Sequence, residues 1–334
     1  MNDGTLLEKG ARSTRLRLQQ AQRRYPLLQL AILVVLCVYA FSTIEGLASS
    51  PSIKSILVVA SFLGLAAIGQ TLVVLIGGLD LSVPGLVLVG AFMTSKLAGG
   101  DGWPVWLLLI AVTAAAAICG LVSGYVSYFH NVQPLIATLG VGAVATGAVL
   151  VWTAGAPAPA VPESLASLTR ITQSTFGLPI PPVVVIWIVL ILVVEFLLRK
   201  TRTGRNVYLT GSNRKAAELA LVPTSRIWLG AFVVSAVFSA LTGVLLASYS
   251  GSADVGLGDP YLFQSLTAVI VGGTAFGARG DYARTVLGVL ILAMLSTILL
   301  GRGFTFADQQ IVYGALILIA VFVYARDRRL ADQI

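Results

Sequence analysis

The chain has 334 residues, of which 57% are hydrophobic and only 11% charged, whereas soluble domains carry about 25% charged residues. This composition excludes a soluble globular protein and predicts a polytopic membrane protein. The net charge of +8 does not indicate nucleic-acid binding. The Lys and Arg residues gather in three segments, with six in residues 1–26, seven in 199–226 and three in 326–334, as topology signals do.

Ten apolar stretches follow one another along the chain, and several reach the 17–25 residues that about 30 Å of hydrocarbon requires. They cover residues 27–44, 55–76, 83–97, 105–129, 135–154, 183–198, 227–249, 261–276, 283–300 and 310–324. We therefore expect an all-α membrane protein with about ten transmembrane helices. The stretches 83–97 and 261–276 are the shortest of these predictions, and a broken or re-entrant helix would also explain them.

The charge distribution predicts the topology. Lys and Arg near span ends resist translocation, so all three basic segments, and with them both termini, are expected on the cytoplasmic side. Residues 1–26 are predicted to form a basic tail that is partly helical from Thr14 to Arg24, residues 27–325 the transmembrane domain, and 326–334 a second tail. Residues 155–182 are expected outside, with a short helix from Pro162 to Thr169.

Cys37 and Cys119 fall inside apolar stretches, and the one histidine, His130, lies in a short turn. Isolated buried cysteines behave as small core residues. The sequence predicts neither a disulfide framework nor a metal site.

The basic segment 199–226 is the most polar part of the interior of the chain. Ser212 or Asn213 is expected to cap a short helix from Arg214 to about Leu221, which Pro223 ends. Such a helix would dock into a groove of another protein, although a solvated connector would explain the charges equally well. The residues expected to make the contact are Gly211, Ser212, Asn213, Arg214, Ala216, Ala217, Leu219 and Ala220.

A second polar interruption, GGLDLSVPG at residues 77–85, separates two apolar stretches. A carboxylate near membrane depth is costly and faces a cavity or a partner, and irregular backbone there survives only inside protein or beside water. One interpretation is a hinge or a break lining the transport path; the other is that Asp80 or Ser82 simply caps the helix beginning at Val83. The candidate residues are Gly77, Gly78, Asp80, Ser82, Pro84 and Gly85.

Residues 71–85 resemble residues 265–280, and the two GG pairs lie 195 residues apart. This similarity predicts a parallel duplication, as transporters often contain, and adds Gly272, Gly273 and Thr274 to the hinge candidates. Near the inner surface, Glu195 is expected to pair with Arg199 four residues later on one helix face.

The sequence contains no G-x-x-x-x-G-K-[ST] motif, so it predicts no P-loop nucleotide site. It also lacks a series of His, Asp and Glu residues that would form a proton relay along the spans. A transporter without either device takes its energy from a partner.

Three stretches carry a resemblance to a known family. They are GQTLVVLIGGLDLSVPG (69–85), TRTGRNVYLTGSNRKAAELALVPTSRIW (201–228) and LTAVIVGGTAFGARGDYARTVLGVLI (266–291). Together they resemble the ribose-type permeases of bacterial ABC sugar importers, over nearly the whole chain from about residue 27 to 325. Pro84, Asp281, Tyr282 and Arg284 depart from the family pattern at positions that are usually glycine or Gly-rich.

The resemblance implies the type II importer fold in the bacterial inner membrane, with residues 199–226 as the cytoplasmic coupling loop and 212–221 as its coupling helix. It implies a second permease copy or a sister permease, an ATP-binding subunit that holds ATP and Mg, and a periplasmic sugar-binding protein; no cofactor is expected on this chain. Competing hypotheses are the same architecture importing branched-chain amino acids or nucleosides, an ion-coupled carrier, and a membrane-embedded enzyme.

Overall fold

The computed structural model describes residues 26–154, 156, 158–277 and 280–331, and over these residues the protein is helical without a β-strand. The predicted helix at Thr14–Arg24 lies outside the described residues. The elements are α2 (Leu27–Thr43), α3 (Ser50–Leu75), α4 (Val83–Met93) continued by the π-helix η1 (Thr94–Gly100), α5 (Val105–Phe129), α6 (Pro134–Thr153), α7 (Glu163–Thr169), α8 (Pro182–Lys200), α9 (Arg202–Ser212), α10 (Arg214–Leu219), α11 (Thr224–Ser250), α12 (Asp259–Gly272), α13 (Tyr282–Gly301) and α14 (Phe306–Ala331).

Each of the ten predicted stretches corresponds to a helix, and the predicted short helix near Pro162 is confirmed as α7. Among the described residues, seven helices are long and apolar enough to cross a membrane: α3, α4 with η1, α5, α6, α8, α11 and α13. With 17 residues α2 is shorter, as is α12 with 14. The chain is therefore a multi-pass membrane protein, while the count of ten spans stays a prediction.

Proline and glycine determine many of the helix ends. A proline occupies one of the first two positions of α3, α4, α6, α8 and α12, where its missing N–H costs no hydrogen bond. Glycines with positive φ follow α3, α11 and α12, at Gly77, Gly251 and Gly273. Because only glycine adopts this conformation without strain, these positions end their helices sharply.

The core lies around α3 and α11. In the most apolar stretch of α3, 78% of the residues are buried, against 22% in that of α5. Glycines allow the closest approaches: a Cβ on Gly69 would lie 2.1 Å from Ser235 Cα, and one on Gly243 would lie 1.9 Å from the Val87 carbonyl oxygen. The large apolar side chains left exposed on α5, α6 and α8 are those that a bilayer would cover.

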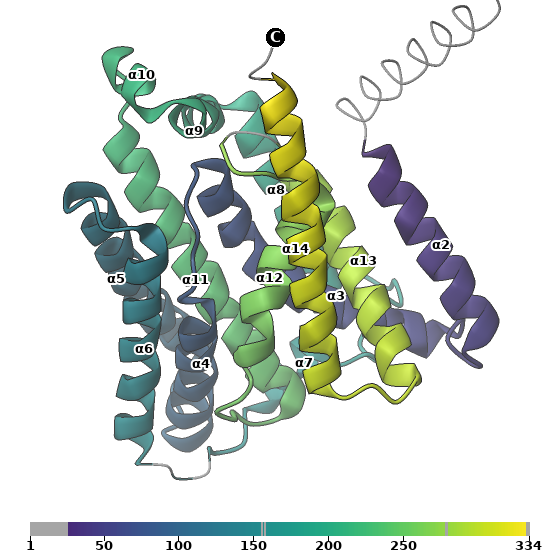
Figure 1. Ribbon diagram of the computed structural model, residues 1–334. Coiled ribbons are helices and arrows are strands. Elements are labelled where there is room, and N and C mark those ends of the chain that lie inside the picture. The colour runs from purple at the N-terminus through teal and green to yellow at the C-terminus, as the bar shows by residue number, and fades with distance from the viewer. Residues whose placement is uncertain (1–25, 155, 157, 278–279, 332–334) are drawn as a thin grey trace, which may run out of the picture.

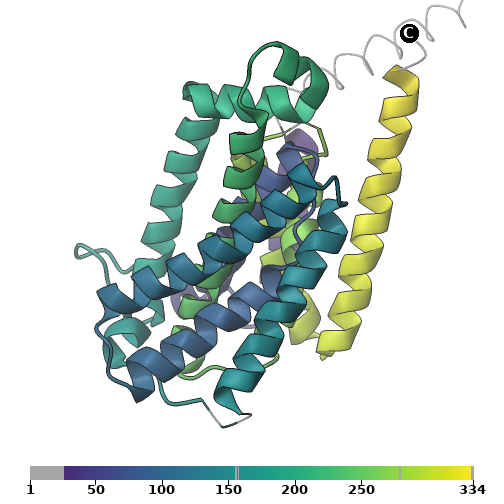
Figure 2. The same ribbon diagram turned by 90° about the vertical axis from the view of Figure 1, so that its left-hand side faces the viewer.

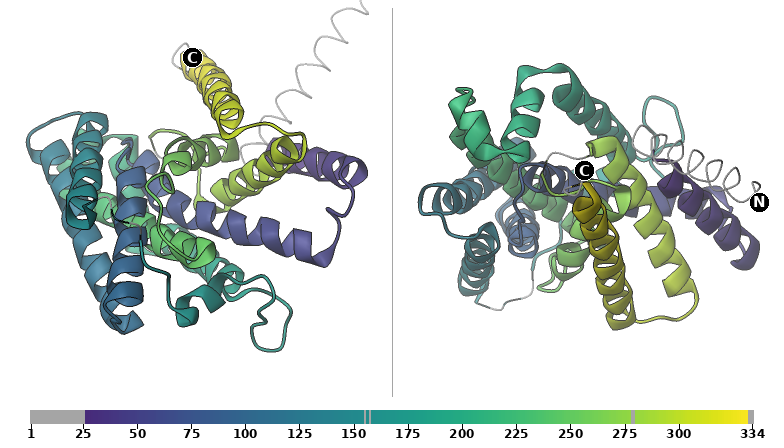
Figure 3. Two further views of the ribbon diagram at one scale, coloured as in Figure 1. Left: turned by 90° about the horizontal axis from the view of Figure 1, so that it is seen from below. Right: turned by 45° about the horizontal axis from the view of Figure 1, so that its top comes forward.

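The two ends of the bundle differ. The amphipathic helices α9 and α10 lie at one end, together with the C-terminal end of α14, whereas α7 and the connection from α13 to α14 lie at the opposite end (Figure 1). In a second view α14 lies at the margin of the bundle (Figure 2). Figure 3 shows the bundle from below, where α3 extends across it; α3 packs against both α12 and α13.

Candidate functional site

The segment between α8 and α11 folds into two helices rather than one. Thr201 caps α9 by accepting a hydrogen bond from the Gly204 N–H at 3.2 Å. Asn213 caps α10 by accepting from the Ala216 N–H at 3.1 Å. Of the two predicted caps, Asn213 is confirmed, while Ser212 ends α9 without capping α10. The predicted short helix beginning at Arg214 is confirmed as α10, which ends at Leu219 rather than at about Leu221, whereas α9 was not predicted.

The outer face of α10 is accessible. Leu219 is 87% exposed and Leu221, just beyond the helix, is 91% exposed. Of the remaining predicted contact residues, Ser212, Asn213, Ala216 and Ala220 are exposed, and Gly211 and Arg214 are half-buried. Ala217 is only 4% exposed, so it lies on the inner face of α10 and is not available to a partner in this conformation.

A polar cluster that sequence reasoning missed holds α10 against α5. The guanidinium of Arg214 lies 3.7 Å from the centre of the Tyr128 ring, and its Nε is 3.1 Å from Oε1 of Glu218. The Tyr128 hydroxyl donates to the same oxygen at 2.9 Å. Hydrogen bonds from Arg214, Tyr128 and Thr224 lower the pKa of Glu218 below its usual range, so this carboxylate stays ionised. The i,i+4 spacing of Arg214 and Glu218 was the one feature of the sequence that could have indicated their ion pair.

The break after α3 is a tight glycine turn. Gly78 N–H donates to the Val73 carbonyl at 2.8 Å and Gly77 N–H donates to the Val74 carbonyl at 3.0 Å, a Schellman-type end with φ of +90° at Gly77. The chain then folds back beside α6, where Leu81 N–H donates to Thr138 Oγ1 at 3.0 Å. Since Thr138 lies four residues inside α6, this contact lies about 6 Å from the start of that helix.

Asp80 is 2% exposed, and no ion pair to it occurs in the part of the chain that the structure describes. Its Oδ1 accepts from the Ser82 N–H at 2.9 Å and from the Ser82 hydroxyl at 2.5 Å. Ser82 occupies the N-cap position of α4 without a side-chain cap bond. The predicted cap by Ser82 is therefore wrong, because its hydroxyl donates to Asp80 and forms a local turn instead.

The start of α4 packs tightly against its neighbours. A Cβ on Gly85 would lie 2.4 Å from the Gly142 carbonyl oxygen of α6. Pro84 presents its own carbonyl to Gly258, where an added Cβ would lie 2.3 Å away. About two turns before the break, both amide atoms of Gln70 are buried without a hydrogen-bond partner among the described residues. Buried amide groups of this kind are satisfied by water or by a polar solute.

The second GG pair ends α12 in the same way, but in a different register. Gly273 N–H donates to Ile270 at 3.0 Å and Thr274 N–H donates to Val269 at 3.1 Å. The turn glycines are thus Gly77 and Gly273, 196 residues apart rather than the 195 of the sequence similarity. Gly272 is instead a helical residue packed against α13, since its added Cβ would meet the Arg284 carbonyl oxygen at 2.3 Å.

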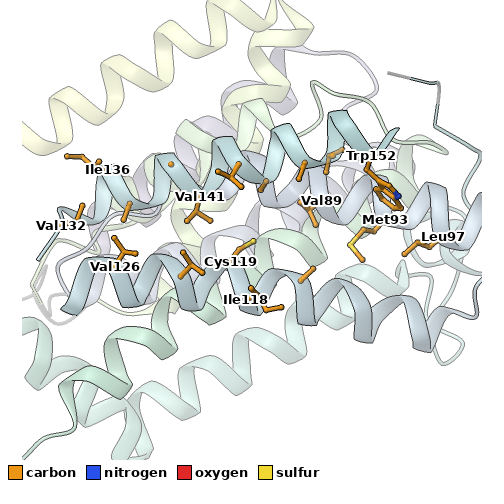
Figure 4. A pocket seen from close by; sticks show the side chains of 18 residues that line it. Val89, Met93, Leu97, Ile118, Cys119, Val126, Val132, Ile136, Val141 and Trp152 are labelled. Atoms are coloured by element: carbon orange, nitrogen blue, oxygen red, sulfur yellow. The ribbon is translucent and has the colours of Figure 1, made fainter. Parts of the chain in front are cut away.

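An apolar groove of about 890 Å³ lies between α4, α5 and α6 (Figure 4). Side chains such as Val89, Met93, Cys119, Val141 and Trp152 line it, and none of the predicted hinge residues does. Its lining suits hydrocarbon rather than a polar solute, so the groove is separate from the breaks at Gly77 and Gly273.

The fold and these two features define a class: a helical, multi-pass membrane protein with an anchored surface helix and two core helices that end at glycine turns. Residues 52–321 match the family model described as branched-chain amino acid transport system / permease component, and the chain belongs to this family.

Individual relatives agree with that assignment. The chain is 33% identical over 279 residues to the ribose import permease protein of Haemophilus influenzae, covering 82% of this chain and 84% of the relative. It is 29% identical over 266 residues to the autoinducer 2 import system permease protein LsrD of Escherichia coli K12, covering 78% and 79%. The LsrD protein of Photorhabdus luminescens is 27% identical over the same length.

Proposed function

We propose that this chain is the membrane-spanning permease subunit of an ATP-driven ABC importer and carries a monosaccharide or a related polyol across the bacterial inner membrane. The names of the relatives support a sugar-type cargo over branched-chain amino acids or nucleosides, although the family description itself mentions branched-chain amino acids. The chain itself catalyses no reaction in this proposal. ATP and Mg bind to a separate ATPase subunit, and a periplasmic binding protein delivers the cargo.

The observation that carries the coupling role is the exposed apolar face of α10. A leucine that is 87% exposed on a helix held to α5 by the Tyr128 hydrogen bond and a stacked arginine is a preorganised apolar anchor for a groove on another protein. In this role Leu219 contacts the ATPase directly, and Ala217 acts by keeping α10 packed against the bundle. The breaks at Gly77 and Gly273 provide the positions where the core helices bend.

The proposal requires two permease subunits around one path, either two copies of this chain or this chain with a sister permease. It also places α9 and α10 in the cytoplasm. An ion-coupled carrier is the alternative from another class, and it would work without the surface of α10.

A mild-detergent pull-down tests the proposal. The tagged chain should recover a P-loop ATPase, identified by mass spectrometry, and Leu219→Glu should lower that recovery at least about tenfold, because central apolar contacts dominate binding energy. Leu178→Glu is the matched control, since Leu178 is 57% exposed at the opposite end of the bundle. The proposal would be overturned if the chain purified alone and an ion gradient drove its uptake of ribose into liposomes.

A further inference from the structure

The turn from Gly280 to Thr285 is bonded to α9 on one side and to α3 on the other. We propose that this turn transmits movement of α9 and α10 to the glycine break at the end of α3. The inference rests on the proposed function, because it assumes that a partner moves α10. It goes further by naming the residues through which this chain passes that movement inward.

On the cytoplasmic side, two side chains join the turn to α8 and α9. The Tyr208 hydroxyl of α9 donates to the Gly280 carbonyl at 2.9 Å. Arg199, at the end of α8, donates from Nη2 to Asp281 Oδ2 at 2.9 Å and pairs with Glu195, as the sequence predicted. Burial, together with the charges of Asp281 and Glu195, raises the pKa of Tyr208 to about 12, so its hydroxyl stays protonated and remains a donor at neutral pH.

The same two carboxylates hold the first turn of α13. Asp281 Oδ1 accepts from the Arg284 N–H at 2.9 Å, and Glu195 Oε2 accepts from the Ala283 N–H at 3.2 Å. Carboxylates at a helix N-terminus are stabilised by its free N–H groups and by its dipole. Arg199 therefore contacts two groups that both position α13, and a shift of α8 or α9 moves the start of that helix.

On the membrane side, two contacts join α13 to α3. Tyr282 is fully buried; its hydroxyl donates to the Gly64 carbonyl at 2.8 Å and accepts from Trp187 Nε1 at 3.0 Å. Thr71 Oγ1 of α3 donates to Thr285 Oγ1 at 3.0 Å. Thr71 precedes Gly77 by six residues, so this contact lies less than two helical turns from the break.

The chain of contacts therefore runs from Tyr208 through Gly280 and Tyr282 or Thr285 into α3. The two ends of this path are hydrogen bonds between elements far apart in sequence, and the backbone from Gly280 to Thr285 joins them. The bonds into α3 are buried, where such bonds resist rearrangement. In the ribose-type pattern this turn is usually Gly-rich, whereas here it contains Asp281, Tyr282 and Arg284. A glycine turn would bend without moving its neighbours, whereas this turn is held on both sides.

The test measures hydrogen–deuterium exchange in the complex of this chain with its ATPase, with and without MgATP plus orthovanadate. The variants are Tyr208→Phe, which removes one hydroxyl, and Asp281→Asn, which keeps an acceptor for the Arg284 N–H but loses the charge that pairs with Arg199. Tyr125→Phe is the matched control, because Tyr125 lies half-exposed at the same end of the bundle and outside this contact chain.

In the wild type and in Tyr125→Phe, MgATP–vanadate should change exchange both in α9–α10 and in residues 76–82. In Tyr208→Phe and Asp281→Asn the response of α9–α10 should remain, while the response at 76–82 should fall roughly 2- to 10-fold, the factor that one hydrogen bond supplies. An unchanged response at 76–82 in both variants would overturn the transmission role. No response of α9–α10 in the wild type would instead count against the proposed function.

Discussion

Asp80 holds the backbone after α3 through a single oxygen, which accepts both the N–H and the hydroxyl of Ser82. This bonding explains why a carboxylate is placed at a buried break: its two-residue turn redirects the chain into α4 without a helix cap. Neither the hinge interpretation nor the capping interpretation is complete, since the residue shapes the break itself.

If the chain acts as proposed, we expect Asp80→Ala to lower ATP-driven uptake of the cargo about tenfold while the amount of protein in the membrane falls less than twofold. The alanine leaves the N–H and hydroxyl of Ser82 buried without their acceptor, at a cost of about 1–3 kcal/mol, which distorts the break before it unfolds the bundle. Asp80→Asn is the control, because its amide oxygen can still accept both bonds. Uptake and membrane content can be compared by radiolabelled transport and immunoblotting; a parallel loss of both in Asp80→Ala would reduce its role to assembly.

For single residues, the sequence predicted the positions of helix caps better than the contact partners of side chains. It indicated that a short polar residue would cap the helix starting at Arg214, and Asn213 does so. It could not show that Arg214 stacks on Tyr128, because that ring lies 86 residues away in sequence. The pairing of Arg199 with Asp281 was missed for the same reason, whereas the local pair with Glu195 was predictable from its spacing.

The crossing of α4 and α11 depends on glycine at two places. A Cβ on Gly90 would lie 1.9 Å from the Ala240 carbonyl oxygen, and one on Gly243 would lie at the same distance from that of Val87. Both obstacles are backbone atoms, which cannot move aside as a flexible side chain would. The two helices therefore pack backbone to backbone, as small residues permit in membrane proteins.

We expect Gly243→Ala to destabilise the purified protein by about 1–3 kcal/mol, the usual cost of overpacking. Gly140→Ala on α6 is the control, because an added Cβ there meets nothing within 4 Å, and it should change stability by less than about 0.5 kcal/mol. Thermal unfolding in detergent would measure both. Equal stability of the two variants would show that the crossing has room to relax.

Element positions followed from hydropathy, because long apolar runs specify transmembrane helices with little ambiguity. The position of α9 did not, since its sequence RTGRNVYLTGS holds two glycines and several residues of low helix propensity. Its stability comes from tertiary contacts: Gly204 packs on the carbonyl oxygens of Leu197 and Leu198, and Tyr208 bonds to Gly280. The bond to Gly280 joins residues 72 positions apart, so no local stretch of sequence could have revealed it.

Over the whole molecule, the two similar sequence segments correspond to the helices α3 and α12. Each ends in a glycine turn of the same type, and the two helices pack against each other. The one-residue difference between 195 and 196 arises because the sequence similarity aligns the GG letters, whereas the structure aligns the residue with positive φ. That residue is the first glycine of one pair and the second of the other.

The ten-span topology can be decided by labelling. Cys37 and Cys119 would be replaced, and single cysteines introduced at the exposed positions Phe176, Lys215 and Phe304. If α12 crosses the membrane despite its 14 residues, then α13 runs outward and Phe304 lies outside, on the same side as Phe176. The arrangement in Figure 1 supports this topology, because the α13–α14 connection lies at the end of the bundle opposite α9. An impermeant maleimide should label Phe176→Cys and Phe304→Cys in intact spheroplasts and Lys215→Cys only after lysis. If Phe304→Cys were instead labelled only after lysis, α12 would return to the side of the membrane from which it entered. The basic C-terminal segment would then lie outside, which contradicts the rule that Lys and Arg near span ends stay on the cytoplasmic side.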